Sequence, residues 1–373
     1  MKHRILTALA ATGIITASGF SLYGAPGKAA NTGEAMIAEI PGVSTPTLST
    51  EIDTLFKDDE MAETRALVIM RGGEIVVERY APGYDRNTRF ISWSMAKSVT
   101  AVLIGLMVTD GRLALNAPAP VPAWQRPGDP RGAITLRHLL HMASGLEHTE
   151  AGSPPYESDE VRMLFLDGRD DMAAYATAQP LEAEPGAKFE YSTNTSVILS
   201  DIITSRLTNS KDSDVRRRAM TDYMRGRLFE PLGITSMVPE FDANGTMIGG
   251  SIIQANARDW AKFGEFLRNK GSIAGNQVLP RGWVDFMTTS SPNEPAYGGH
   301  IWLNKPRPAG RGKVLYPDLL PADVFACQGH LGQFVIVSPS QRLTMVRLGK
   351  TQDDVLDPVE TQLGKIAVLF PVG

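Results

Sequence analysis

Segments that favour β-strands lie near the two ends of this 373-residue chain, and segments that favour helices fill the middle. Two β-rich runs at residues 66–70 and 74–80 are joined by a short glycine-containing turn, which predicts a hairpin. Three more runs, separated by tight turns, follow at 324–327, 333–337 and 343–348. Sequential hairpins form antiparallel sheets, so we expect an α+β fold in which both ends of the chain build one antiparallel sheet flanked by helices.

The middle of the chain predicts a mostly helical inserted lobe. Helical runs separated by Pro- and Gly-rich loops occur at 136–142, 158–166, 171–177, 195–208, 214–228 and 257–269. We therefore expect residues 31–110 and 281–373 to form an α/β lobe and residues 111–280 to form a mainly helical lobe. A cleft between two such lobes is the natural place for a site.

The first 30 residues resemble a secretory signal. Met1-Lys2-His3-Arg4 is basic, residues 5–23 are mostly apolar, and small residues follow. We expect an exported protein, periplasmic in a bacterium, whose mature chain starts near residues 25 to 31. Because the apolar centre is long, an uncleaved membrane anchor is the alternative, and it would be the only contact with a membrane.

The composition excludes several kinds of partner. Apolar residues make up 43% of the chain and charged residues 21%, which is typical of a globular protein. The net charge is −4 and no basic tract stands out, so we expect no nucleic-acid partner. The single cysteine, Cys327, permits no intrachain disulfide, and the sequence has no Cys/His cluster with zinc spacing.

A Ser-x-x-Lys motif at Ser94 and Lys97 precedes the apolar run 101–107. If Ser94 opens a helix, the amine of Lys97 lies one turn further on the same face, within reach of the serine oxygen. Burial would lower the pKa of the lysine, and a neutral amine can activate a serine hydroxyl. Free backbone N–H groups at the helix start would stabilise an oxyanion. An exposed helix start with Ser94 as N-cap is the alternative interpretation.

Tyr191 lies in a loop before a helical run, three residues from Asn194. A lysine ammonium beside Tyr191 would lower the pKa of the phenol, so that the tyrosine can shuttle the serine proton. A buried structural aromatic is the alternative. The amide of Asn194 is suited either to a substrate carbonyl or to holding the lysine.

The segment Gly329-His330-Leu331-Gly332-Gln333 precedes a predicted strand. Glycine at that point permits a ligand to approach the strand backbone closely. We expect the backbone N–H of Gln333 to be the second oxyanion donor beside that of Ser94. His330 would point into the same space, or else be an ordinary turn histidine.

Together, these motifs resemble the serine β-lactamase-like superfamily on its class C side. That group includes class C β-lactamases, D-alanyl-D-alanine carboxypeptidases, family VIII esterases and 6-aminohexanoate-dimer hydrolases. The resemblance covers about residues 65 to 370, and further supporting stretches lie at 134–146, 228–234, 249–264 and 297–302. It implies that Ser94 is the nucleophile, Lys97 its activating amine and Tyr191 the general base and acid. It also implies that Gly332, followed by Gln333, marks the strand that completes the oxyanion hole.

The chain departs from that family pattern at two motifs. Class C β-lactamases have Tyr-x-Asn, whereas Asn194 stands three residues after Tyr191, a spacing closer to the 6-aminohexanoate-dimer hydrolases, which leaves its role open. The β-lactamase Lys-Thr-Gly is replaced by His330-Leu331-Gly332, which weakens recognition of a β-lactam carboxylate. Residues 155–164 resemble the amide-hydrolase branch, so Tyr156 is a candidate substrate contact, with an ordinary surface tyrosine as the alternative.

These observations predict an exported serine hydrolase that cleaves a small-molecule ester or amide through an acyl-enzyme. Neither a metal nor an organic cofactor is needed for that chemistry. A β-lactamase or D-Ala-D-Ala-type peptidase is the alternative within the same class. A non-catalytic relative that binds cell-wall or peptide ligands is the alternative of another class. The sequence indicates neither the oligomeric state nor the preference between ester and amide.

Overall fold

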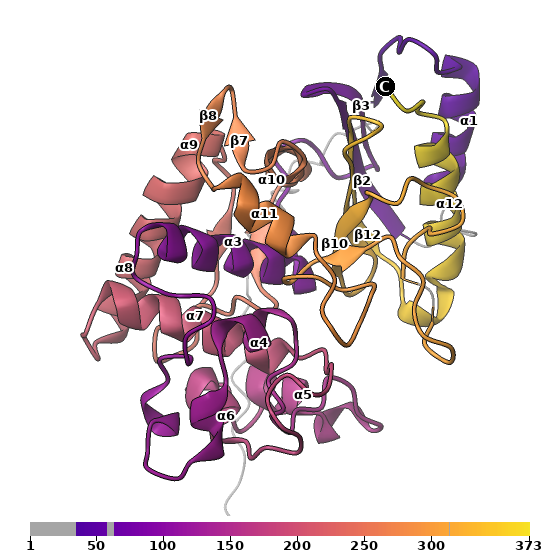
Figure 1. Ribbon diagram of the computed structural model, residues 1–373. Helices are drawn as coiled ribbons and strands as arrows, with labels where there is room; N and C mark the ends of the chain where they lie inside the picture. The colour runs from indigo at the N-terminus through magenta and orange to yellow at the C-terminus, as the bar shows by residue number, and fades with distance from the viewer. Residues whose placement is uncertain (1–34, 58–62, 313) are drawn as a thin grey trace, which may run out of the picture.

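A seven-stranded antiparallel sheet, built from both ends of the chain, is the frame of the protein in the computed structural model (Figure 1). The structure describes residues 35–57, 63–312 and 314–373. The expected signal at residues 1–30 lies outside the described residues, so export stays a prediction. The strands, in their order across the sheet, are β1 (Ala35–Ile37), β3 (Glu74–Tyr80), β2 (Glu63–Arg71), β12 (Leu343–Lys350), β11 (Gln333–Ser338), β10 (Phe325–Gly329) and β9 (Trp302–Leu303).

The first hairpin is joined directly to the last strands of the chain. β2 pairs with β12, and Val68 lies opposite Val346. Most residues of β2, β11 and β12 are buried, because helices cover both faces of the sheet. The α+β fold with an antiparallel sheet, expected from the two sets of hairpins, is therefore confirmed.

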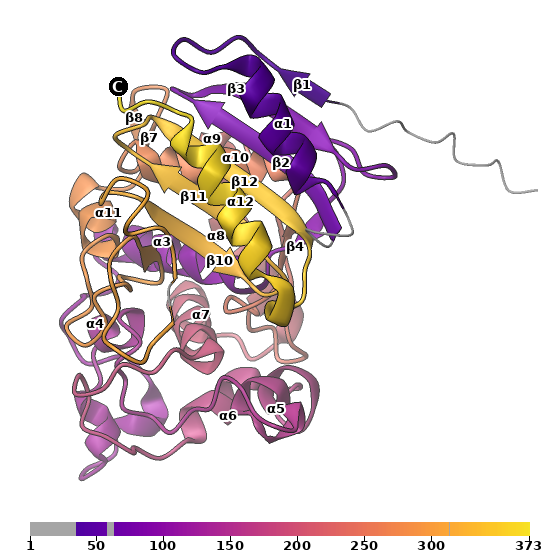
Figure 2. The same ribbon diagram turned by 90° about the vertical axis from the view of Figure 1, so that its right-hand side faces the viewer.

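Two helices from opposite ends of the chain lie on one face of the sheet, and a third lies on the other (Figure 2). α1 (Thr45–Leu55) and α12 (Asp357–Val368) pack together on the first face. α10 (Ala257–Arg268) covers the opposite face, against β2, β11 and β12. A Cβ atom on Gly264 would lie 2.6 Å from a methyl of Thr344, so glycine lets α10 approach the sheet closely.

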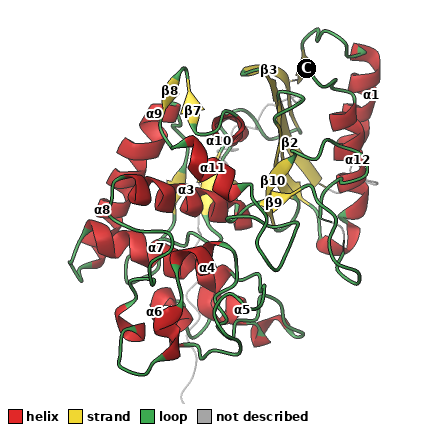
Figure 3. Ribbon diagram, viewed as in Figure 1, coloured by secondary structure: helices red, strands yellow, loops and turns green. Residues whose placement is uncertain are grey.

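The remaining helices gather beside the sheet, as the red ribbons of Figure 3 show. They are α3 (Ala96–Thr109), α4 (Leu136–Leu140), α5 (Asp159–Phe165), α6 (Met172–Ala178), α7 (Thr193–Leu207), α8 (Ser213–Met224), α9 (Glu230–Leu232) and α11 (Arg281–Met287), with a π-helical turn at Arg225–Phe229. Short 3₁₀ turns occur at Trp93–Met95, Pro122–Trp124, Pro130–Ala133, Pro155–Glu157 and Asp353–Val355. Minor strands are β4 (Phe90–Ile91), β5 (Val238–Pro239), β6 (Ile253–Ala255), β7 (Ser272–Ile273) and β8 (Asn276–Gln277). The division into lobes at residues 110 and 280 stays a prediction.

α3 lies at the centre of this assembly. Its residues from Ala96 to Met107 are all buried, which matches an apolar sequence with no polar face. It packs against α7, and its Gly105 lies against the ring of Trp283. Any residue at the first turn of α3 is therefore held in a rigid, largely dry environment. Among the described residues, no helix combines the length and the apolar character needed to cross a membrane.

Candidate active site

Ser94 lies in a 3₁₀ turn (Trp93–Met95) that connects β4 to α3. The turn is fixed by Ser92, whose backbone N–H donates to the carbonyl of Ile253 and whose hydroxyl accepts from the N–H of Ile253 at 3.0 Å. Trp93 has a φ of 45°, a strained conformation for a bulky residue. Such strain persists only where the surroundings enforce it, and here it presents Ser94 at the start of the helix.

Lys97 lies one turn beyond Ser94, as the spacing predicts, and its side chain is only 2% exposed. Its Nζ atom lies 3.0 Å from Ser94 Oγ, 2.7 Å from Thr193 Oγ1 and 2.8 Å from the carbonyl oxygen of Gly250. Burial lowers the pKa of Lys97, while the nearby carboxylates of Glu150 and Glu160 oppose that shift. A neutral amine has two N–H groups and one lone pair, so it can donate to Thr193 and Gly250 and accept the serine proton.

Thr193 and Glu150 belong to this site, and sequence reasoning missed both. The Oε1 atom of Glu150 lies 3.8 Å from Lys97 Nζ and accepts a hydrogen bond of 2.6 Å from Thr193 Oγ1. The backbone N–H of Thr193, at the start of α7, donates to Glu150 Oε2 at 2.6 Å. A signal for Thr193 was present, because it stands two residues after Tyr191, where class C β-lactamases have asparagine.

Asn194, for which the sequence left open a contact with a substrate carbonyl or with the lysine, makes no hydrogen bond to Lys97. It is fully buried in α7, and its side-chain oxygen and nitrogen have no hydrogen-bond partner among the described residues. The helix turns the side chain of Asn194 away from that of Thr193, because neighbouring residues of a helix point in different directions. Thr193 therefore makes the hydrogen bond to Lys97 that was one of the two alternatives for Asn194.

Tyr191 reaches the same pocket, in an aromatic cluster. Its ring is stacked on that of Trp302, with centroids 5.5 Å apart, and lies edge-on to that of Tyr297. Lys97 Nζ is 4.7 Å from the centre of the Tyr191 ring. Burial raises the pKa of Tyr191 well above its ordinary value, the carboxylate of Glu150 adds to this, and a hydrogen bond with the Ser94 hydroxyl partly offsets it.

The expected lowering of the Tyr191 pKa by the lysine is therefore wrong. The amine of Lys97 faces the ring of Tyr191, and the carboxylates of Glu150 and Glu160 disfavour a phenolate. Tyr191 is a neutral phenol in the resting protein, which suits it to donate a proton.

The pocket in front of Ser94 is small, with a volume of about 10 Å³. This is close to the room that one water molecule needs. The lining residues come from α3, the loop before α7, the segment that leads to β9, and β10. They are Ser94, Lys97, Ser98, Tyr191, Tyr297, His300, Trp302, Ala326, Cys327 and Gln328.

One backbone N–H of β10 is directed into this pocket. Ala326 pairs with Trp302 of β9, and the Val324 carbonyl accepts from the N–H of Asn304. Because backbone groups alternate between the two sides of a strand, the N–H of Gln328 points to the same side. β9 begins at Trp302 and does not extend far enough to pair with Gln328. The Gln328 N–H therefore faces the pocket that Ser94 lines.

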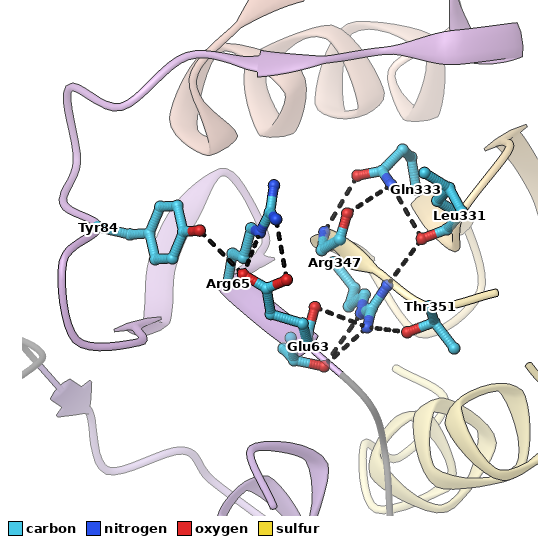
Figure 4. Close-up of polar contacts among 9 residues, drawn as sticks. Glu63, Arg65, Tyr84, Leu331, Gln333, Arg347 and Thr351 are labelled. Atoms are coloured by element: carbon cyan, nitrogen blue, oxygen red, sulfur yellow. Dashed lines mark hydrogen bonds and ion pairs between the residues drawn. The ribbon is translucent and has the colours of Figure 1, made fainter. Parts of the chain in front are cut away.

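Gly332 lies in the turn between β10 and β11. Gln333, labelled in Figure 4, begins β11 directly after that turn. Gln333 lies opposite Gly329, so by the same alternation its N–H faces the backbone of β10 and not Ser94. Its side chain donates to the carbonyls of Leu331 at 3.0 Å and Gly349 at 2.8 Å, and accepts from the N–H of Gly349 at 3.0 Å. The structure therefore does not bring Gln333 beside Ser94, because the turn places it on the next strand.

The turn is also held by a buried arginine. Arg347 of β12 donates to the carbonyl of Gly332 at 2.7 Å and to the hydroxyl of Thr64. It also donates to the hydroxyl of Thr351 at 2.7 Å (Figure 4). Burial lowers the pKa of Arg347 to about 9. Gly332 has a φ of 75° and faces this guanidinium, so its position in the turn is structural.

His330 and Tyr156 lie outside the pocket lining. His330 is exposed, with its ring edge-on to Trp93 at 5.3 Å and its Nδ1 atom 3.3 Å from a carboxylate oxygen of Asp353. Tyr156, in the 3₁₀ turn before α5, is 61% exposed. A contact of either residue with substrate stays a prediction. Among the described residues, no group of three or more His, Cys, Asp or Glu side chains is arranged to hold a metal ion.

The chain belongs to the beta-lactamase family, because the family model described as Beta-lactamase matches residues 52–368. The resemblance drawn from its motifs is thereby confirmed. It is 23% identical over 260 residues to the 6-aminohexanoate-dimer hydrolase of Paenarthrobacter ureafaciens, covering 68% of this chain and 64% of that one. The chain thus spans slightly less than two thirds of the length of that curated relative.

Solved structures share the fold. One is a penicillin-binding protein homologue from Caulobacter crescentus, with a TM-score of 0.62 and 16% identity over 90% of this chain and 99% of the other. Another is a family VIII carboxylesterase, with a TM-score of 0.56 and 17% identity over 88% of this chain and all of the other. At these identities the likeness concerns the fold alone.

Proposed function

We propose that the protein is a serine hydrolase that cleaves an ester or amide bond through an acyl-enzyme formed on Ser94. One observation carries the proposal: the buried amine of Lys97 lies 3.0 Å from Ser94 Oγ, while Thr193 and Gly250 accept its other two hydrogen bonds. A buried amine so placed has the lowered pKa of a base and a lone pair directed at the hydroxyl. The curated relative named as a hydrolase supports the reaction class.

The proposed reaction assigns the two proton transfers to different residues. Lys97 takes the proton of Ser94 as the serine oxygen attacks the carbonyl carbon. Tyr191, a neutral phenol, donates its proton to the departing alcohol or amine. The ammonium of Lys97 then passes its proton to the phenolate of Tyr191, so that both groups are neutral again. Water attacks the acyl-enzyme while Lys97 takes a proton from that water, and Lys97 returns the proton to the oxygen of Ser94 as the acid product leaves. The backbone N–H groups of Ser94 and Gln328 hold the oxyanion, and Gln328 has the role that we had expected of Gln333.

The charges around the site favour a hydrolase of other esters or amides over a β-lactamase or a D-Ala-D-Ala-type peptidase. His330, which we expected from the sequence in place of the lysine that binds a drug carboxylate in β-lactamases, is exposed and lies outside the pocket lining, with its Nδ1 atom 3.3 Å from a carboxylate oxygen of Asp353. The carboxylates of Glu150 and Glu160 lie close enough to act on the pKa of Lys97. An anionic substrate would be repelled by that pair, so a neutral or cationic ester or amide fits better.

The experiment compares the wild type with Ser94→Ala on short-chain p-nitrophenyl esters, a linear amide and nitrocefin. Ser205→Ala is the matched control, because Ser205 is exposed on α7 and far from Ser94 in sequence. We expect ester hydrolysis by the wild type and the control, none by Ser94→Ala, and little or no nitrocefin turnover. Activity retained in Ser94→Ala would refute the nucleophile. A folded wild type that a fluorophosphonate leaves unlabelled would favour a non-catalytic binding protein.

A further inference from the structure

The carboxylate of Glu150 is hydrogen-bonded to the start of α7 and lies close to the amine of Lys97. Glu150 is in the loop between α4 and α5, and its side chain is 25% exposed. One of its oxygens accepts from the Thr193 hydroxyl and the other from the Thr193 backbone N–H, both at 2.6 Å. This two-point attachment fixes the carboxylate at the helix N-terminus, where negative charge is favoured.

We propose that Glu150, acting through the hydroxyl of Thr193, is a positioning residue for Lys97: it orients the amine and stabilises the ammonium that forms when Lys97 takes the serine proton. The proposal rests on the proposed function of Ser94 and Lys97. It extends the contact between Ser94 and Lys97 by two residues, so that Ser94, Lys97, Thr193 and Glu150 form one chain of hydrogen bonds.

The donors and acceptors that each side chain offers determine the direction of these hydrogen bonds. A threonine hydroxyl has one proton, and an ionised carboxylate only accepts. The Thr193 hydroxyl must therefore donate to Glu150, and its lone pairs are left to accept from Lys97. With a second N–H directed at the Gly250 carbonyl, a neutral Lys97 has its lone pair free for the proton of Ser94. Glu150 thus holds the amine in the orientation of a base.

The charge of Glu150 matters at the next step. Once Lys97 has taken the serine proton, an ammonium stands in a site where its side chain is 2% exposed. A buried charge is unfavourable unless an opposite charge lies nearby, and Glu150 Oε1 is 3.8 Å away. A buried acid in a serine–histidine–aspartate site stabilises the imidazolium in the same way.

The other titratable groups that face Lys97 carry less charge. Burial and the charge of Glu150 raise the pKa of Glu160, in α5, to about 7, so Glu160 is only partly ionised at neutral pH. Tyr191 is a neutral phenol, and burial lowers the pKa of His300 to about 3, so its imidazole is neutral. Glu150 is therefore the principal counter-charge of Lys97 among these described groups.

The test measures the rate of fluorophosphonate labelling against pH for four variants and the wild type. Glu150→Gln keeps the shape and removes the charge, Thr193→Val removes the hydroxyl, and Thr193→Ser restores it. Glu147→Gln is the matched control, because Glu147 is an exposed glutamate on the same loop. Far-UV circular dichroism and thermal unfolding establish that each variant is folded.

Loss of the carboxylate should lower the pKa of Lys97 further, since a negative neighbour favours the ammonium. For Glu150→Gln we expect the acid limb of the profile to move down by about one pH unit and the plateau rate to fall about tenfold. The labelling rate of Thr193→Val should also fall about tenfold. Thr193→Ser should recover most of that rate, and the rate of Glu147→Gln should match that of the wild type.

Two results would overturn the role of Glu150. One is a folded Glu150→Gln whose acid limb stays in place, whatever its rate. The other is equal labelling of Thr193→Val and Thr193→Ser, which decides the matter even if Glu150→Gln does not fold. Neither outcome is confused with failure of the proposed function, because in that case the wild type is not labelled or Ser94→Ala is labelled as well.

Discussion

The ring of Tyr191 lies on the ring of Trp302, with centroids 5.5 Å apart and planes inclined by 23°. Tyr191 precedes α7, whereas Trp302 begins β9, which pairs with β10. The stack therefore joins Tyr191, the proposed acid, to β9 at the edge of the sheet. The neighbouring strand, β10, lines the pocket with Ser94. Tyr297 closes the cluster edge-on to both rings. A phenol held on two sides keeps its hydroxyl at one position relative to the nucleophile.

Replacing Trp302 by alanine should release the Tyr191 ring and lower kcat for p-nitrophenyl esters. A displacement of a catalytic group by about 1 Å can reduce a rate by about 100-fold. We therefore expect kcat of Trp302→Ala to fall by about tenfold to 100-fold. Trp302→Phe keeps an aromatic face under the phenol and should retain most of the activity. Steady-state kinetics on both variants measures the effect, and a wild-type kcat in Trp302→Ala would show that the stack does not position Tyr191.

Tyr191→Phe should affect amides far more than activated esters. An amine needs a proton in order to leave, whereas p-nitrophenolate leaves without one, so the loss of the acid falls on the amide. We expect a decrease of about 100-fold or more for a linear amide and a clearly smaller one for the p-nitrophenyl ester with the same acyl group. The two kcat/KM values are compared in wild type and variant. Equal losses on both substrates would argue that Tyr191 acts before the leaving group departs.

The pH profile should reflect Lys97 on the acid side and Tyr191 on the alkaline side. Lys97 acts as a neutral amine, so activity is lost as the pH falls through its pKa. Burial lowers that pKa below the ordinary 10.5, so the acid limb of the profile should lie below pH 10.5. Tyr191 acts as a phenol with a raised pKa, so activity on the alkaline side should be lost only above pH 10, the ordinary pKa of tyrosine. A kcat/KM profile with an acid limb near 10.5 would contradict the lowered pKa of Lys97.

The contact between Ser94 and Lys97 and the hairpins could be predicted from local sequence relations, whereas Tyr191 was placed in the site only through the family resemblance. Ser94 and Lys97 lie three residues apart, so a single helical turn brings them together, and the hairpins follow from short turns between β-rich runs. Glu150 is in a loop without periodicity, so only the folded chain shows that it meets Thr193 and Lys97. The sign of the Tyr191 pKa shift depends on that same carboxylate.

The second oxyanion donor expected from the sequence, Gln333, lies on β11, whereas the donor that we propose, Gln328, lies on β10. On sequence grounds, residues Gly329 to Gln333 are interpreted as the segment that leads into the predicted strand at 333–337. In the structure the turn at residues 330–332 separates β10 from β11, and the side of a strand that a backbone N–H faces alternates with each residue. The group directed at the pocket is therefore that of Gln328, on the strand before the turn. The sequence already separates the runs at 324–327 and 333–337, but only the folded chain shows which of the two strands contributes to the pocket that Ser94 lines.

Gly329→Ala should separate β10 from the turn that carries Ser94. A Cβ atom at this position would lie 2.2 Å from the carbonyl oxygen of Ser92 and 3.2 Å from the Cβ atom of Trp93, so the backbone has to move. Such overpacking costs about 1–3 kcal/mol, which denaturant unfolding measures. Because the movement carries the Gln328 N–H away from Ser94, we also expect most of the ester hydrolysis to be lost.

Gly226→Ala is the matched control for this substitution, because its added Cβ atom would have no neighbour within 4 Å. That variant should keep both the stability and the activity of the wild type. The decisive comparison is the activity of Gly329→Ala under conditions in which unfolding curves show it to be fully folded. Wild-type hydrolysis there would mean that the close approach of β10 to Ser92 is a packing feature only, and that the oxyanion is held without the strand.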